Sequence, residues 1–358
     1  DREVFMFGFS IFMNEDLSTE DIHYIKRMKQ AGFKGIFTSM HIPEDDAQAY
    51  KMRLEKLGAC AKANQLELMV DISGEALERA GYSFEHLEEL TQHGVTGLRM
   101  DYHIDNEQIS KASHKMKISL NASTLVEDEV EELRRLGANF SNLEAWHNYY
   151  PRPETGLATP YFLEQNQWLE KYGFKRVAFV AGDAKKRLPL RLGLPTLEKH
   201  RDMHPLAAAL DLFKYETDEV YIGDGDLAAT TIEQFENYMQ WDKIVLHVEN
   251  NNSAYYDSVL GEHDNRNDQS PNLIRSANAR FKKVEQIQKE HAEERNKGAV
   301  TLDNELYGRY MGEIQVCKKA LPAHPNINVV AYVIEKDRDL LDVIYSKQKF
   351  ELKEKERK

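Results

Sequence analysis

Carboxylates, histidines and asparagines follow most of the strand-like segments in the first two thirds of this 358-residue chain. In a barrel of parallel strands these strand ends meet at one face, where they can act together. The polar residues at the predicted strand ends are Asn14, His41, Asp71, Asp101, His103, Asn121, Glu144, His147, Asn148, Asp183 and Asp224. For any one of these carboxylates taken alone, a helix cap or loop ligand is the better explanation, and we favour that interpretation most for Asp183 and Asp224. Five carboxylates on one rim nevertheless indicate acid–base chemistry.

The densest group of polar and aromatic residues is the stretch Glu144–Gly156, Glu-Ala-Trp-His-Asn-Tyr-Tyr-Pro-Arg-Pro-Glu-Thr-Gly. Its two prolines stiffen the loop, because each fixes its own φ and restrains the residue before it. Aromatic rings stack on sugar faces, and carboxylates and amides bind sugar hydroxyls. We therefore expect sugar contacts from Trp146, His147, Asn148, Tyr149 and Arg152. The alternative is an ordinary surface loop whose aromatic rings pack onto the protein.

A cationic loop follows the seventh predicted strand and contains Lys185, Lys186, Arg187 and Arg191. Barrels commonly bind phosphate after this strand, and arginine matches phosphate oxygens in a bidentate way. The alternative is a solvated loop that screens an acidic protein. A second arginine-bearing segment, Ile-Arg-Ser-Ala-Asn-Ala-Arg around Arg275, could close over the barrel mouth or pair with acids of its own domain.

Strand-like segments alternate with helical patterns over roughly 225 residues, which is the length of a (β/α)₈ TIM barrel. A doubly wound open sheet would need a glycine-rich phosphate loop after its first strand, and Gly-Phe-Ser-Ile-Phe-Met-Asn is not one. We therefore predict an α/β fold with a barrel domain. Its strands are expected at Val4–Ile11, Gly35–Thr38, Leu66–Ile72, Gly97–Tyr102, Lys117–Leu120, Asn139–Leu143, Arg176–Val180 and Glu219–Ile222.

Two helices of this domain carry clear boundary signals. Ser18 and Asp21 have the spacing of a capping box, and Gly32 is the expected stop. Thr159 and Pro160 predict another helix start, with threonine as N-cap and proline in the first helical position.

The rhythm of the chain changes near residue 240, so we expect domains at 1–240 and 241–358. The second is predicted to be a small, β-rich domain in which only Phe281–Lys297 and the charged tail after Lys336 are helical or frayed. Its strands are expected at Lys243–Glu249, Asn272–Ser276, Ala299–Leu302, Glu313–Lys318 and Asn326–Ile334.

The overall composition is that of an acidic globular protein. Lysine and arginine number 47 against 60 aspartates and glutamates, a formal charge of −13, which argues against nucleic acid or an anionic membrane as a partner. Two distant cysteines, Cys60 and Cys317, imply no disulfide framework. No apolar run reaches the length of a membrane span and no signal peptide is recognisable, so we expect a cytoplasmic protein. The oligomeric state stays open, a homo-oligomer included.

The predicted strand ends carry no lysine, which disfavours Schiff-base chemistry. His41, His103, His147 and the nearby acids could converge on a metal. However, no His-x-His or His-Glu-x-x-His spacing supports such a site, so we expect neither metal nor cofactor.

Several segments resemble the bacterial 6-phospho-N-acetylmuramidase family. They are Met-Phe-Gly-Phe-Ser-Ile-Phe at 6–12, His-Asn-Tyr-Tyr-Pro-Arg-Pro-Glu-Thr-Gly-Leu at 147–157, Gly-Leu-Pro-Thr-Leu-Glu-Lys-His-Arg at 193–201, Ile-Arg-Ser-Ala-Asn-Ala-Arg at 274–280, Gly-Glu-Ile-Gln-Val at 312–316 and Asn-Ile-Asn-Val-Val-Ala at 326–331. The resemblance spans the chain and implies a TIM barrel followed by a cyclophilin-like domain. It further implies a phosphorylated amino-sugar disaccharide as substrate. The implied reaction is hydrolysis of the β-1,4 bond of N-acetylmuramic acid 6-phosphate–N-acetylglucosamine during peptidoglycan recycling.

Glycoside hydrolysis usually needs one protonated and one ionised carboxyl group. We expect this pair among Glu144, Asp101 and Asp183, with Asp71 next, and place Glu144 beside Trp146 as the acid. Alternatively the substrate's own N-acetyl oxygen is the nucleophile and an aspartate orients it. Arg187, Arg191 and Arg275 would hold the phosphate, and His41, His103, Asn121 and Asp224 would add contacts. A metal-dependent isomerase or lyase acting on a phosphosugar, or a non-catalytic phosphosugar-binding protein, remains as an alternative.

Overall fold

The computed structural model describes residues 5–40, 46–100, 104–279 and 285–356. Its contacts divide the chain into two compact units, Asp1–Ile232 and Glu233–Lys358. Within the described ranges, no helix has both the length and the apolar character needed to cross a membrane.

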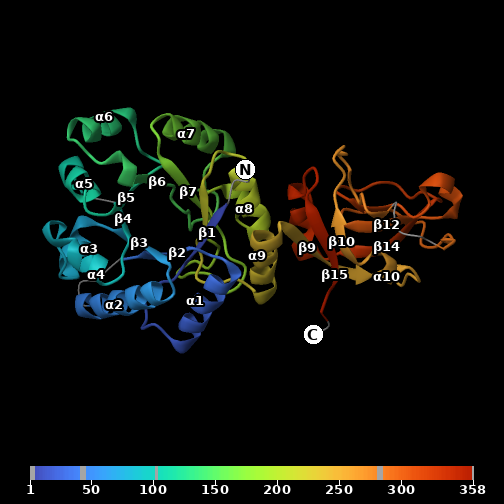
Figure 1. The fold of residues 1–358 in the computed structure, drawn as a ribbon, viewed down its shortest axis with the longest axis horizontal. Helices are drawn as coiled ribbons and strands as arrows, with labels where there is room; N and C mark the ends of the chain where they lie inside the picture. Colours follow the sequence, from blue (N-terminus) through green and yellow to red (C-terminus); the bar gives the residue numbers. More distant parts are fainter. Residues whose placement is uncertain (1–4, 41–45, 101–103, 280–284, 357–358) are drawn as a thin grey trace. The chain divides into compact units, whose positions relative to one another are not determined.

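The first unit is a closed barrel of parallel strands that pair in sequence order, with the last strand beside the first (Figure 1). This arrangement confirms the predicted (β/α)₈ fold. In the described residues the strands are β1 (Met6–Ser10), β2 (Gly35–Ser39), β3 (Glu67–Ile72), β4 (Gly97–Met100), β5 (Lys117–Asn121), β6 (Leu143–Trp146), β7 (Lys175–Val180) and β8 (Glu219–Ile222).

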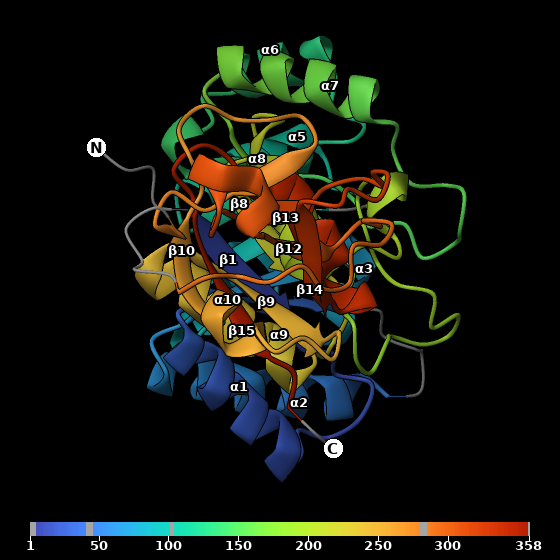
Figure 2. The same cartoon turned by 90° about the vertical axis from the view of Figure 1, so that its right-hand side faces the viewer.

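Helices surround the barrel, with α6 and α7 on the opposite side from α1 and α2 (Figures 1 and 2). Short 3₁₀ turns lie between some of them, among them η2 (Phe140–Asn142) and η3 (Glu198–His200). The helices of this unit are α1 (Thr19–Ala31), α2 (Ala47–Ala63), α3 (Gly74–Arg79), α4 (Glu88–Gln92), α5 (Asn106–Ser113), α6 (Glu127–Arg135), α7 (Thr159–Lys171) and α8 (Pro205–Phe213). Helix α9 (Ala229–Trp241) begins in this unit and continues into the second.

The predicted helix starts are correct to within one residue. Ser18 caps α1, and Asp21 returns the hydrogen bond in a complete capping box. Gly32 ends this helix in the left-handed conformation, at φ 113°. Helix α7 has Ala158 rather than Thr159 as its N-cap residue, and Pro160 lies in its first turn.

The sixth strand, predicted at Asn139–Leu143, begins about four residues later than expected, at Leu143. Asn139–Asn142 do not extend, because the Asn139 N–H and the Asn142 side-chain amide both donate to Ser113 at 2.8 Å and hold a 3₁₀ turn. Strand β6 therefore begins only at Leu143. Glu144 becomes its second residue and lies in register with Lys175, the first residue of β7. This places Glu144 near the N-terminal end of the barrel.

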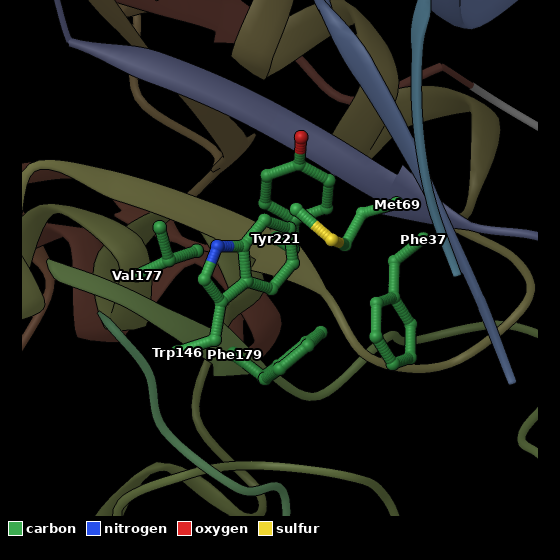
Figure 3. Packing of buried hydrophobic residues seen from close by; sticks show 6 residues of the cluster. All are labelled: Phe37, Met69, Trp146, Val177, Phe179 and Tyr221. Atoms are coloured by element: carbon green, nitrogen blue, oxygen red, sulfur yellow. The ribbon is translucent and has the colours of Figure 1, made fainter. Parts of the chain in front are cut away.

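A layer of large apolar and aromatic side chains fills the middle of the barrel (Figure 3). Trp146 is at its centre, with ring centroids 4.6 Å from Tyr221, 5.8 Å from Phe37 and 5.9 Å from Phe179. All four side chains are at most 3% exposed. Such close packing separates the two ends of the barrel.

On the N-terminal side of this layer, acidic and basic side chains alternate near the starts of the strands. Lys117 Nζ lies 3.3 Å from Glu144 and 3.2 Å from Glu67. Lys175 lies 3.6 Å from Glu144 and also pairs with Glu219. The charges of these side chains therefore compensate one another at the N-terminal end of the barrel.

In the described part of the second unit, a seven-stranded sheet has the order β10-β15-β9-β14-β12-β13-β11. A bridge between Asn265 and Ser276 joins its two edge strands, so the sheet curls back on itself. This confirms a β-rich second unit. The elements are β9 (Lys243–Asn250), α10 (Tyr256–Val259), β10 (Gly261–Asp264), β11 (Leu273–Arg275), β12 (Ala299–Asp303), β13 (Ile314–Cys317), β14 (Ile327–Val333), the 3₁₀ segment η6 (Glu335–Val343) and β15 (Lys349–Glu354).

Neither segment predicted to be helical in the second unit forms an α-helix in the described residues, although Glu335–Val343 of the tail forms the 3₁₀ segment η6. Residues 285–297 are irregular, and the buried side chain of Asn328 holds them by accepting from the Glu290 N–H at 3.0 Å and donating to the Gln288 carbonyl at 2.9 Å. The charged tail forms β15, which pairs with β9 and buries Phe350 and Leu352. Tertiary pairing thus overrides the charged composition of both segments.

Two glycines make room for Tyr221 inside the barrel, and they give a stability prediction. A Cβ on Gly35 would lie 2.1 Å from the Tyr221 hydroxyl oxygen, whereas a Cβ on Gly8 would lie 2.2 Å from a ring carbon. We expect Gly35→Ala and Gly8→Ala each to lower the free energy of unfolding by at least about 1–3 kcal/mol, through overpacking.

Adding Tyr221→Phe removes only the hydroxyl, so it should recover most of the loss in Gly35→Ala and little in Gly8→Ala. Urea unfolding of the single and double variants measures both effects. Equal recovery in the two backgrounds would contradict this packing.

Candidate active site

A pocket of about 120 Å³ opens at the C-terminal end of the barrel. Three of its lining residues are phenylalanines or tyrosine, and the other four have polar side chains. It is lined by Phe37, Asp71, Arg99, His147, Asn148, Tyr149 and Phe179. Its volume is below the roughly 300–1,000 Å³ of pockets that enclose drug-sized ligands, so it fits a substituent rather than a whole disaccharide.

The polar side of the pocket is organised by Arg99, which is only 4% exposed. Its Nη1 donates to Asp71 Oδ1 at 3.0 Å. Its Nη2 donates to the Trp146 carbonyl at 3.3 Å and to Asn148 Oδ1. One guanidinium group from β4 thus holds the end of β3 and the exit of β6 together. Removing any acceptor would leave part of a buried charge unpaired.

His147 is fully buried and neutral at physiological pH, because burial lowers its pKa to about 4. Its Nε2 lies 2.6 Å from Asn166 Oδ1, and its Nδ1 lies 3.2 Å from Ser123 Oγ. The Asn166 amide donates to the Tyr215 carbonyl, so its oxygen faces the histidine and Nε2 carries the proton. Both ring nitrogens are occupied, so His147 positions the loop and is not a base.

Tyr149 connects the pocket to the cationic loop. Its hydroxyl oxygen accepts from Arg187 Nη1 at 2.5 Å, and the Arg187 guanidinium lies 3.6 Å from the ring centroid of Phe12. Burial raises the pKa of Tyr149, so its phenol stays protonated. Lys186, Arg187 and Arg191 form no ion pair with a carboxylate of the described residues.

The loop after β6 is held rigidly by Glu198 and Arg201. The Glu198 carboxylate accepts from the N–H groups of Glu154 at 2.8 Å and Gly156 at 2.7 Å, and it pairs with Arg201 at 2.6 Å. Arg201 also donates to the carbonyl of Tyr150 at 3.0 Å. A Cβ on Gly156 would lie 2.6 Å from the Glu198 carboxylate, so this approach requires glycine.

Glu144 is not at this site, which corrects the prediction that it is the catalytic acid. It lies below the aromatic layer, paired with Lys117 and Lys175. Trp146 is likewise wrong as a sugar contact, since it is 1% exposed and its indole N–H donates to Glu144 at 2.9 Å. The prediction failed because β6 begins about four residues later than expected, so both residues lie within the strand and not in the loop beyond it.

Asp183 and Asp224 hold loops, the interpretation that we favoured for both. Asp183 accepts from the Ala228 N–H at 2.8 Å and from Thr231 Oγ1 at 2.5 Å, at the start of α9. Asp224 is fully buried and accepts from three backbone N–H groups, those of Gly182, Arg187 and Leu194. These bonds support the interpretation of both residues as loop ligands, and neither residue lines the pocket.

The other predicted contacts are scattered. Asn121 accepts from the Ser123 N–H at 3.0 Å, and Arg152 and Arg191 are exposed. Arg275 lies on β11 of the second unit, 3.5 Å from Asp268. His41, Asp101 and His103 lie outside the described residues.

Of the four predicted catalytic carboxylates, only Asp71 lines the pocket within the described part of the chain. Arg99 was missed, although one sequence signal pointed to it: an arginine inside the otherwise apolar segment Gly97–Met100. A buried charge on a strand needs a partner, and Asp71 is that partner. Among the described residues, no group of histidine, cysteine, aspartate and glutamate side chains is arranged to hold a metal ion.

Family models described as the N-terminal and C-terminal parts of 6-phospho-N-acetylmuramidase match residues 7–237 and 243–353. The chain belongs to the 6-phospho-N-acetylmuramidase family. The name of this family implies a glycosidase. The two matched ranges cover the barrel and the β-rich unit.

Two solved structures are similar over almost the whole chain. A conserved protein of unknown function from Enterococcus faecalis is 48% identical, with a TM-score of 0.91, and the match covers 97% of this chain and 96% of that one. An uncharacterized B. cereus protein is 24% identical, with a TM-score of 0.73 and coverage of 98% and 99%, a likeness that shows the fold alone. No curated protein matches the chain.

The Glu198–Arg201 pair predicts a specific acid sensitivity. Its hydrogen bond from Arg201 lowers the pKa of Glu198 from 4.5 to about 2. The stabilisation is therefore complete above pH 4.5 and is lost as the pH falls toward 2. We expect Glu198→Gln to lower the free energy of unfolding by about 1–3 kcal/mol at pH 6, with a smaller deficit at pH 3.

Urea unfolding at pH 6, 4 and 3 measures this deficit. The exposed Glu164 on α7 provides the matched control, and Glu164→Gln should leave stability almost unchanged at each pH. A deficit for Glu198→Gln that does not depend on pH would show that the charge contributes nothing.

Proposed function

We propose that this protein is a cytoplasmic hydrolase that cleaves the β-1,4 bond of N-acetylmuramic acid 6-phosphate–N-acetylglucosamine during peptidoglycan recycling. Family membership across both units is the observation that carries the proposal. The pocket at the C-terminal end of the barrel supports it, since barrel enzymes keep their active sites at that end.

Asp71 is our candidate for the ionised carboxylate. Its ion pair with Arg99 suits a group that stays charged while positive charge develops on the sugar ring. Alternatively it orients the substrate's N-acetyl oxygen, which then attacks the anomeric carbon. Asp101, which directly follows β4 in the sequence, is our candidate for the protonated acid.

The cationic loop after β7 is our candidate for the 6-phosphate site. The Arg187 side chain is held in place by Phe12 and Tyr149, and the remaining donors of its guanidinium group have no carboxylate partner in the described ranges. A preordered guanidinium can bind phosphate at a small entropic cost. Phosphate binding accelerates cleavage only insofar as it positions or distorts the sugar at the reacting carbon.

The catalytic proposal predicts that two carboxylates, Asp71 and Asp101, are needed for turnover and that a third, Glu144, is not. Asp71→Asn and Asp101→Asn should each lower turnover by about 100-fold or more, because each removes a group acting on the reacting bond. Glu144→Gln makes the same chemical change below the aromatic layer and should lower stability without a comparable loss of turnover. Release of N-acetylglucosamine from the purified phosphodisaccharide measures turnover, and circular dichroism confirms folding.

Several results of this assay would overturn the proposal. Binding without release would indicate a non-catalytic phosphosugar-binding protein. Loss of activity with a chelator would favour a metal-dependent enzyme. Full activity of Asp71→Asn together with an inactive, folded Glu144→Gln would reverse the assignment of the site.

The phosphate proposal predicts a loss of substrate preference. Arg187→Met keeps an apolar side chain against Phe12 but removes the charge, so it should raise KM for the phosphorylated disaccharide by about 10- to 100-fold. Activity on the unphosphorylated disaccharide should change little, and Arg187→Lys should lie between. Steady-state kinetics on both substrates measure the preference, with Arg135→Met at an exposed site of α6 as control. An unchanged preference would remove Arg187 from the phosphate site.

A further inference from the structure

The hydrogen bonds of Arg99 determine which atoms of its neighbours are left for a ligand. Arginine has only donors, so the Asn148 amide must turn its oxygen toward Arg99. The Asn148 Nδ2 donor then points away from Arg99 and has no hydrogen-bond partner in the described part of the chain. The Oδ1 atom of Asp71 accepts a hydrogen bond from Arg99. Its Oδ2 atom has only the Ser39 hydroxyl as a donor, at 3.5 Å, the outer limit of a hydrogen bond.

The pocket thus presents one donor and one acceptor side by side. Asn148 and Asp71 are bound to the two terminal nitrogens of a single guanidinium group, which fixes their relative position. Both residues line the pocket, together with the rings of Phe37 and Phe179. An amide with a small apolar substituent is the group that matches these three features.

The charges of the pocket disfavour an anion. Asp71 and Arg99 neutralise each other, and burial keeps His147 uncharged. The other lining residues are uncharged, and Tyr149 stays protonated. A phosphate or carboxylate placed here would meet the Asp71 carboxylate without an uncompensated cation. The 6-phosphate therefore belongs elsewhere.

We propose that this pocket binds the 2-acetamido group of the amino sugar that is cleaved. The acetamido N–H donates to Asp71 Oδ2, its carbonyl oxygen accepts from Asn148 Nδ2, and its methyl group packs against Phe37 and Phe179. Arg99 is a positioning residue that holds both polar partners. This inference rests on the proposed function and specifies which substituent of the substrate the pocket selects.

The consequence is discrimination at the 2-position of the sugar. A 2-hydroxyl in place of the acetamido group would leave Asn148 or Asp71 without its partner and the aromatic wall without its methyl group. Sites built around buried hydrogen bonds reject such analogues strongly. We expect a preference of at least about 10-fold for the acetamido sugar, the equivalent of one well-made hydrogen bond.

Calorimetric titration with two monosaccharides tests the inference without relying on turnover. The probes are N-acetylmuramic acid 6-phosphate and the otherwise identical sugar with a 2-hydroxyl group. In Asn148→Asp the carboxylate still accepts from Arg99 but offers no donor, so the preference should fall to less than about 3-fold. The added charge weakens both probes alike, so the ratio of their affinities isolates the lost donor. Asn148→Ala should give the same loss.

Asn139→Asp is the matched control, because Asn139 lies before the other end of β6. Of its side-chain atoms, only the oxygen is hydrogen-bonded in the described residues, accepting from Ser141 at 2.6 and 3.3 Å. This control variant should keep the wild-type preference. A wild-type protein without preference, a preference unaffected in both Asn148 variants, or no binding of either probe would overturn the inference.

The same data separate this inference from the proposed function. If the protein cleaves the phosphodisaccharide but its preference for the acetamido sugar does not depend on Asn148, the proposed function is supported and the inference is wrong. A preference that depends on Asn148 without any release of N-acetylglucosamine would do the reverse.

Discussion

A buried guanidinium group is the constraint on which the candidate site depends. Taking the charge of Arg99 out of water is costly unless a carboxylate and further acceptors surround it. Those acceptors come from the end of β3, the end of β6 and the loop beyond. The bonds to the two terminal nitrogens of Arg99 bring Asp71 and Asn148 together, and they leave Asn148 Nδ2 without a partner in the described residues and Asp71 Oδ2 with only the Ser39 hydroxyl at 3.5 Å.

The aromatic layer of the barrel decides which carboxylates can take part in chemistry. Trp146, Tyr221, Phe37 and Phe179 fill the interior and exclude water between the two ends. Glu144, on the N-terminal side of this layer, pairs with lysines. Asp71, on the C-terminal side, pairs with Arg99 and lines the pocket, so the surroundings of a carboxylate on a barrel strand depend on its position along the strand.

Loop rigidity has a similar origin in buried polar contacts. Glu198 and Arg201 bind backbone groups of the loop after β6. The Asp224 carboxylate accepts hydrogen bonds from three backbone N–H groups of the loop after β7. These side chains act on the backbone rather than on a ligand. They allow Tyr149 and Arg187 to meet in a defined geometry at the edge of the pocket.

The sequence by itself determined the alternation of strands and helices, the barrel, the β-rich second unit and the capping box of α1. These features follow from local patterns: apolar periodicity, cap residues and glycine stops. The same patterns placed Asp71, Asn148, Tyr149 and Arg187 near strand ends, and the structure puts all four at the pocket or beside it.

Only the tertiary structure decided the start of β6 and the strand formed by the C-terminal tail. Ser113 on α5 holds Asn139–Asn142 in a turn, and β9 provides the partner that makes β15 a strand. Both effects come from residues distant in sequence, which local propensity cannot register. The later start of β6 places Glu144 near the N-terminal end of the barrel, and the pairing of Arg99 with Asp71 requires β3 and β4 to lie side by side. Burial and long-range hydrogen bonding, which exist only in the folded chain, thus selected the site residues from among the candidates.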